Sequence, residues 1–345
     1  MNKEDRQAGP TIRLRTAGPP NLLPLDADTR LATDFLEGAV AAGADVLLLG
    51  PLPTPGIAYL TQVFDADLGV VISASHNAFC DNGIKFFDGA GTKLTDEIEQ
   101  QIERYVDQLA ITLESAKLGH AQRIDSAQKR YQDFCRSTFP EGRSLEGIKI
   151  VFDGANGAGY KVGPRTFSEL GAEVIPIGCS PNGRNINAGC GSMEPGLVQL
   201  TVPAVKADVG IALAGDGDRV VMVDENGQIL DGDQLLFILA LARKKEGQLK
   251  GPVVGAVMSN LGLEYALRAN DIDFRRAKVG DRHVLEALHE SGGIIGGETS
   301  GHMICLDKTT TGDGIISALQ ILAVMESSGK PLSELAAGMS KYPQT

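Results

Sequence analysis

The sequence predicts an α/β protein made of three similar modules in series, with mixed, mainly parallel sheets. Short runs of Val, Ile and Leu without polar alternation, such as residues 148–152 and 209–213, are typical of strands buried on both faces. Segments with helical spacing of apolar residues alternate with these runs, which indicates parallel βαβ units. Because the alternation occurs three times, we interpret the chain as three related modules.

Before the first module, residues 1–25 are rich in Pro and Gly and lack periodicity, which predicts an irregular leader. The first module should follow as a helix, a strand, a helix and a strand. These elements are expected at residues 34–42, 45–49, 57–64 and 69–73. Residues 95–109 then carry apolar side chains at helical spacing, which predicts an amphipathic helix.

The second and third modules repeat the pattern. In the second, strands are expected at residues 148–152, 173–177 and 209–213, and helices at 163–170 and 195–205. The turn at residues 224–227 predicts a hairpin between strands at 220–223 and 228–230. In the third, strands are expected at 252–258, 273–277 and 293–295, and helices at 261–270, 284–291 and 317–326. We therefore expect a leader over residues 1–27 and domains over 28–135, 136–235 and 236–345.

Composition excludes several classes of protein. The 345 residues carry a formal net charge of −12 and no run of Lys or Arg, so a nucleic-acid partner is not expected. No apolar stretch approaches the ~20 residues of a membrane helix, so no membrane is expected. The five cysteines are scattered without CxxC spacing, which indicates reduced thiols in a cytoplasm. The 42 glycines and 5% aromatic residues favour an α/β enzyme with loops for phosphates or sugars.

The first loop whose residues could take part in catalysis contains Ser75. This serine follows a buried strand, next to His76 and ten residues before Lys85. A hydroxyl in that setting can be phosphorylated, with the imidazole and the amine handling protons. The alternative is a polar turn in which Ser and Asn cap a helix.

Asp216 and Asp218 lie in a second loop, Gly-Asp-Gly-Asp-Arg, that follows the strand at residues 209–213. Two carboxylates separated by glycine can converge on one hard cation, and Mg²⁺ prefers such oxygen ligands. Arg219 adds a bidentate fork for a phosphate or a hydroxyl. The alternative is a common Asp-Gly turn.

Glu298, Ser300 and His302 lie in a third, glycine-flanked loop at residues 296–302. Their side chains suit hydrogen bonds to vicinal sugar hydroxyls, and the alternative is a solvated turn. Because ligands bind beyond the carboxyl ends of strands in open α/β sheets, the three loops are candidates for one site.

Together the three loops resemble those of the α-D-phosphohexomutases and, within them, the bacterial phosphoglucosamine mutases. The family's phosphoserine matches Ser75, its metal loop matches residues 215–219, and its sugar loop matches residues 298–302. The resemblance runs from about residue 28 to the C-terminus. Within the family, residues 278–282 and 307–314 favour glucosamine over glucose or mannose.

The resemblance implies an isomerase that interconverts glucosamine 6-phosphate and glucosamine 1-phosphate through a phosphoserine and a bisphosphate intermediate. It implies Mg²⁺ held by Asp216, Asp218 and the phosphate on Ser75. His76, Lys85 and Arg219 would assist transfer. The residues implied to bind the amino-sugar phosphate are Gly280, Asp281, Arg282, Glu298, Ser300 and His302.

The sequence departs from the family pattern at several places. Ala214 stands where the family's metal loop begins with an aspartate, and Ala78 replaces a proline. The N-terminal segment does not match the family's, and the family's fourth domain, which grips the substrate's second phosphate, is not expected in this chain. Three functional interpretations therefore stay open: an active mutase, a degenerate homologue with little activity, and a Mg²⁺-dependent sugar-phosphate phosphohydrolase.

Overall fold

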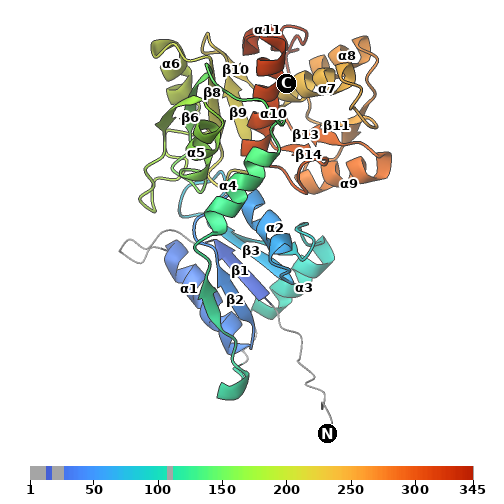
Figure 1. The fold of residues 1–345 in the computed structure, drawn as a ribbon. Helices are drawn as coiled ribbons and strands as arrows, with labels where there is room; N and C mark the ends of the chain where they lie inside the picture. Colours follow the sequence, from blue (N-terminus) through green and yellow to red (C-terminus); the bar gives the residue numbers. More distant parts are fainter. Residues whose placement is uncertain (1–12, 18–26, 107–111, 345) are drawn as a thin grey trace.

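The computed structural model describes residues 13–17, 27–106 and 112–344, with side-chain surroundings from residue 31 onward. Three sheets with flanking helices are arranged in chain order, as the sequence predicts (Figure 1). The first module is drawn in blue, and the second and third lie side by side across from it in green and orange. Helix α4 (Ala127–Ser137) connects the first module to the other two.

The first sheet has the order β4-β3-β1-β2-β5, and only its β3–β4 pair is antiparallel. Its strands are β1 (Arg13–Ala17), β2 (Asp45–Leu48), β3 (Leu68–Ser73), β4 (Gly83–Asp88) and β5 (Ala121–Arg123). Its helices are α1 (Ala27–Ala41), α2 (Thr54–Val63), α3 (Asp96–Val106) and the 3-10 turn Ser115–Lys117.

The irregular structure expected over residues 1–25 is wrong at Arg13–Ala17, which forms the central strand of this sheet. The physical reason is tertiary: β1 is paired in parallel on both sides, with β2 and β3, and such pairing overrides a weak local pattern. Residues 1–12 and 18–26 of the expected leader lie outside the described residues, as do residues 107–109 at the end of the expected helix 95–109.

The second sheet has the order β10-β9-β8-β6-β7. Its strands are β6 (Lys149–Asp153), β7 (Glu173–Ile177), β8 (Val209–Leu213), β9 (Val220–Val223) and β10 (Ile229–Leu230), and its helices are α5 (Val162–Glu169) and α6 (Gly196–Ala204). The expected hairpin is confirmed, since β9 and β10 pair antiparallel. All five residues of β8 are buried, as an uninterrupted apolar run predicts.

The third sheet has the order β12-β11-β13-β14. Its strands are β11 (Val253–Ala256), β12 (Phe274–Ala277), β13 (Ile295–Gly297) and β14 (Met303–Cys305). Its helices are α7 (Gly232–Lys245), α8 (Leu261–Ala269), α9 (Asp281–Ser291), α10 (Gly314–Ser328) and α11 (Leu332–Ala336).

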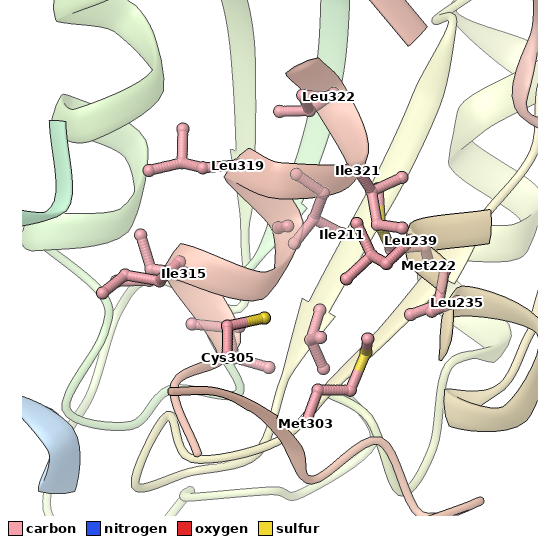
Figure 2. Close-up of a cluster of buried hydrophobic side chains, with 14 of the residues drawn as sticks. Ile211, Met222, Leu235, Leu239, Met303, Cys305, Ile315, Leu319, Ile321 and Leu322 are labelled. Atoms are coloured by element: carbon pink, nitrogen blue, oxygen red, sulfur yellow. The ribbon is translucent and has the colours of Figure 1, made fainter. Parts of the chain in front are cut away.

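Helix α10 is the structural centre of the second and third modules. Residues 314–322 of this helix are all buried, as its mainly apolar sequence there predicts, and only its C-terminal turn is exposed. Figure 2 shows its Ile315, Leu319 and Ile321 among side chains of β8, β9, α7 and β14, all of them in one buried cluster. Asp313 begins α10 by accepting hydrogen bonds from the N–H groups of Ile315 and Ile316, at 2.9 and 3.0 Å.

Packing of these modules brings three strand ends together. The loops after β3, β8 and β13 carry the Ser75, Asp216 and Glu298 segments, as the sequence predicts. Antiparallel β4 returns beside β3 with Val71 opposite Lys85, and this pairing carries the Lys85 side chain back toward Ser75. The fold thereby builds one site from residues of all three modules.

Candidate active site

Ser75 lies directly after β3 in a tightly turned loop. Its φ angle is +56°, a left-handed conformation that is rare outside glycine, and its N–H donates to Ser73 Oγ at 3.0 Å. The hydroxyl lies 3.4 Å from His76 Nδ1 and 3.5 Å from Lys85 Nζ. A serine oxygen between an imidazole and an ammonium group is suited to carry and release a phosphoryl group.

Asp216 and Asp218 extend from the loop after β8 and are buried. Asp216 Oδ2 accepts from Lys85 Nζ at 2.6 Å and from Thr54 Oγ1 at 3.2 Å. Lys85 Nζ also lies 3.4 Å from Asp218 Oδ2. Gly217, with φ of +72°, makes the turn between the two aspartates. One ammonium group therefore joins the serine to both carboxylates.

The charges of this cluster shift its pKa values in definite directions. Burial would lower the pKa of Lys85, but Asp216 and Asp218 raise it, so the amine stays charged. Burial and the neighbouring Asp218 raise the pKa of Asp216. Burial also opposes the charge of Asp218, yet hydrogen bonding from His302 and the charge of Lys85 hold its pKa well below the usual range.

His76 is the group at Ser75 that is best suited to exchange a proton near neutrality. Burial, followed by the positive charge of Arg219, lowers the pKa of its imidazole. The neutral ring can then accept or return a proton at the serine oxygen. Arg219 follows Asp218 on the same loop, and its buried Nε has no hydrogen-bond partner.

The third loop reaches this cluster through His302. The ring is buried, with Nδ1 3.6 Å from Asp218 Oδ2 and Nε2 3.6 Å from Asp281 Oδ2. Glu298 Oε1 accepts from the Gly280 N–H at 2.9 Å, which holds two of the predicted sugar-binding segments together. Ser300 lies exposed on the same turn.

Asp281 and Arg282 lie at the start of α9 and face the first module. Arg282 forms ion pairs with Asp96 and with Glu99, the latter at 3.1 Å, and Lys93 pairs with Asp281. A cavity of about 290 Å³ opens at this junction, lined by Lys85, Lys93, Asp96, Glu99, Gly280 and Arg282 among others. The predicted substrate residues 280–282 therefore lie beside Lys85, but Arg282 is already paired with acidic groups.

The capacity for a cation can be tested on the carboxylates themselves. Asp216 Oδ1 and Asp218 Oδ1 are buried and accept no hydrogen bond, so each has an oxygen free for a metal. Ala214, which is completely buried, supplies no oxygen. Among the described residues, no group of three or more His, Cys, Asp and Glu side chains is arranged to hold a metal. The residues present thus fit a cation only with a further ligand from outside this set, such as a phosphate on Ser75.

Sequence reasoning missed two residues that organise the site. Thr54, at the start of α2, contacts Asp216, and Asn187 donates to the carbonyl oxygens of Ser75 and Asn77 at 3.0 and 2.8 Å. Their partners lie more than 100 residues away along the chain, so no local pattern reveals the contacts.

Comparison with known proteins gives matches along most of the chain. Models of phosphoglucomutase/phosphomannomutase alpha/beta/alpha domains I, II and III match residues 27–111, 129–227 and 231–342. The phosphoglucosamine mutase of Thioalkalivibrio sulfidiphilus is 54% identical over 94% of this chain and 73% of its own length. That of Aeromonas salmonicida is 55% identical over 92% of this chain and 72% of its own length.

Solved structures give the same result for the fold. A phosphoglucomutase/phosphomannomutase family protein from Burkholderia thailandensis superposes with a TM-score of 0.82 at 25% identity, covering 97% of this chain and 72% of that one. The N-acetylphosphoglucosamine mutase of Aspergillus fumigatus, solved with GlcNAc-6P and magnesium, superposes with a TM-score of 0.62 at 18% identity, covering 84% of this chain and 77% of that one.

Proposed function

This chain belongs to the phosphoglucomutase/phosphomannomutase family, and on that premise we propose that it interconverts glucosamine 6-phosphate and glucosamine 1-phosphate. The observation that carries the proposal is the convergence on Lys85 Nζ of Ser75 Oγ at 3.5 Å, Asp216 at 2.6 Å and Asp218 at 3.4 Å. The identity of 54–55% to phosphoglucosamine mutases supports glucosamine as the sugar. The product would serve amino-sugar nucleotide and cell-wall precursor synthesis.

The proposed reaction passes through phosphorylated Ser75. A sugar hydroxyl attacks the phosphorus and gives its proton to neutral His76, while the bond from phosphorus to Ser75 Oγ breaks. The imidazolium then returns the proton to Oγ, which leaves a free Ser75 hydroxyl and a sugar bisphosphate. The Lys85 ammonium stabilises the charge that develops on Ser75 Oγ, and neutral His76 exchanges a proton at the same atom. The bisphosphate then reorients within the site, so that its other phosphoryl group faces Ser75 and is transferred back to it.

Sugar recognition is assigned to the third module, whereas Arg219, on the loop of Asp216 and Asp218, would assist transfer. Glu298, Ser300 and His302 would bind hydroxyl groups, and residues 280–282 would contact the substrate beside Lys85. Binding there requires Arg282 to exchange Asp96 and Glu99 for the ligand. Because the ion pairs of Arg282 are partly exposed, their loss costs little.

Mg²⁺ would be held by Asp216, Asp218 and an oxygen of the Ser75 phosphate. When bound, the ion offsets negative charge on the phosphoryl oxygens. With Ala214 in place of a third carboxylate, we expect weak Mg²⁺ binding and slow turnover.

Location and domain organisation complete the proposal. All five cysteines are free thiols, which supports a reducing compartment, and we propose the cytoplasm. None of the described helices is long and apolar enough to cross a bilayer. Three domains are proposed on the order of the three sheets, with the boundaries 28–135, 136–235 and 236–345 kept as the sequence predicts them, except that the first domain is extended to include β1 (Arg13–Ala17).

The test is ³¹P NMR of the chain with glucosamine 6-phosphate, Mg²⁺ and a catalytic amount of glucosamine 1,6-bisphosphate. Growth of a glucosamine 1-phosphate resonance that is lost in Ser75→Ala supports the mutase. The matched control is Ser327→Ala, an exposed serine whose hydroxyl donates to Val324 O within its own helix. Release of inorganic phosphate instead identifies a phosphohydrolase, and no change in either signal identifies a degenerate homologue.

A further inference from the structure

Asn187 connects the two loops on which the proposed chemistry depends. It lies in the segment between β7 and α6, with a φ of +59°. Its Nδ2 donates to Ser75 O at 3.0 Å and to Asn77 O at 2.8 Å, while its Oδ1 accepts from the Gly215 N–H at 3.0 Å. One amide therefore binds the backbone of the serine loop and the backbone of the aspartate loop at once.

These two backbones approach each other closely. A Cβ atom at Gly215 would lie 2.6 Å from Ser75 O, so no larger residue fits between the loops. The Asn187 amide fills the polar side of this contact and supplies hydrogen-bond partners to two carbonyl oxygens and one N–H group. Ser75 also holds a left-handed φ of +56°, and such a conformation persists only where neighbouring contacts fix it.

The backbone of Asn187 is itself fixed by hydrogen bonds within the second module. Its N–H donates to Ala155 O at 2.8 Å. The buried Asp153 carboxylate accepts from the N–H groups of Ala155 and Gly191, at 2.9 and 2.8 Å, which ties down both sides of the segment that carries Asn187. Hydrogen bonds to residues at and just after the end of β6 therefore fix the segment that carries Asn187.

From this geometry we propose that Asn187 is a positioning residue for phosphoryl transfer, which sets the place of Ser75 relative to Asp216 and Asp218. The inference rests on the proposed function only in naming the transferred group. Phosphoryl transfer is sensitive to position, and a displacement of about 1 Å can lower a rate by about 10²-fold. Asn187 acts through the backbone of Ser75, so its loss should lower the rate of transfer rather than the affinity for the sugar.

The test compares Asn187→Gly with Asn185→Ala. Glycine removes the amide at position 187 and keeps the left-handed backbone without strain. Asn185 is the matched control, because its side chain accepts from Asn182 N–H at 2.8 Å and donates to Ser180 O at 3.1 Å, within its own loop. Three quantities are measured: amide hydrogen exchange over residues 73–78, the maximal rate at which glucosamine 1,6-bisphosphate phosphorylates Ser75, and the bisphosphate concentration that gives half of that rate.

We expect Asn187→Gly to speed exchange over residues 73–78 and to lower the maximal phosphorylation rate by about 10²-fold, with the half-saturating bisphosphate concentration unchanged. Asn185→Ala should leave all three quantities as in the parent chain. Unchanged exchange in Asn187→Gly, an equal loss in Asn185→Ala, or a change confined to half-saturation would overturn the proposal. If the parent chain takes up no phosphoryl group, the proposed function is wrong, but the role of Asn187 is still tested. In that case the amide hydrogen exchange of residues 73–78 shows whether Asn187 fixes the Ser75 loop.

Discussion

Replacing Ala214 by aspartate should restore the missing carboxylate of the metal loop. Ala214 is buried at the start of that loop, where its N–H donates to Arg219 O at 3.1 Å and its carbonyl accepts from Gly217 N–H at 2.9 Å. Because both backbone groups close the turn that carries Asp216 and Asp218, we expect a carboxylate at residue 214 to join the same cluster of charges.

The expected change in the free energy of unfolding is a decrease without Mg²⁺ and an increase with Mg²⁺. Without Mg²⁺, Lys85 already serves Asp216 and Asp218, so a third buried carboxylate lacks a partner and lowers the free energy of unfolding by about 1–3 kcal/mol or more. With Mg²⁺, loss of a supporting group alone typically costs about 10–100-fold in affinity, so gain of a direct ligand should tighten binding at least that much. At saturating metal this gain stabilises the variant by about 1.4–2.7 kcal/mol.

The assay is Mg²⁺ titration calorimetry together with urea unfolding, with and without Mg²⁺. Ala214→Asn is the matched control, because it adds an oxygen of the same shape without the charge and should tighten Mg²⁺ much less. If Ala214→Asp leaves Mg²⁺ affinity unchanged, residue 214 does not face the ion and our placement of the metal loop is wrong.

Two further changes test the charges of the interior. Burial raises the pKa of Asp313 to about 6, above its unfolded value, so its protonation stabilises the fold at low pH and that contribution is lost as pH rises through about 6. Relative to Asp313→Asn, the parent chain should therefore lose about 1 kcal/mol of unfolding free energy between pH 5 and pH 7 in chemical denaturation, and an equal pH dependence in both chains would contradict this. Lys85→Met removes the ammonium group from Asp216 and Asp218, which should destabilise the chain by up to about 3–5 kcal/mol at pH 7 and by clearly less at pH 4.5, where the carboxylates take up protons; a loss that does not depend on pH would show that Lys85 acts by packing alone.

Strands buried on both faces were the part of the fold that local sequence predicts best. The expected strand at residues 209–213 coincides with β8, which is buried throughout, and the one at 148–152 is shifted by one residue from β6. The expected strand at 173–177 also coincides with β7, although β7 is half exposed. The antiparallel strands β4 and β14 were not predicted. Strand β4 is half exposed and flanked by polar turns, and β14 has only three residues, so neither produces a strong periodic signal.

The residues of the candidate site also fall into two groups: those that local motifs predict and those that only the packing of the modules brings together. Ser75, Asp216 and Asp218 follow strands in local motifs, and the structure brings them to one ammonium group as the motifs imply. Asn187 carries no such motif, because its partners are contributed by the packing of two sheets. Likewise, the pairing of Arg282 with Asp96 and Glu99 joins the first and third modules and cannot be read from either segment alone.

Whether Ser75 carries the phosphoryl group is the central question, and one measurement addresses it most directly. The full chain is incubated with glucosamine 1,6-bisphosphate and Mg²⁺, its intact mass is recorded, and the modified peptide is sequenced. We predict a gain of about 80 Da, one phosphate, located on Ser75 and lost in Ser75→Ala. Phosphate on another serine with none on Ser75, or an equal gain in Ser75→Ala, would contradict the account.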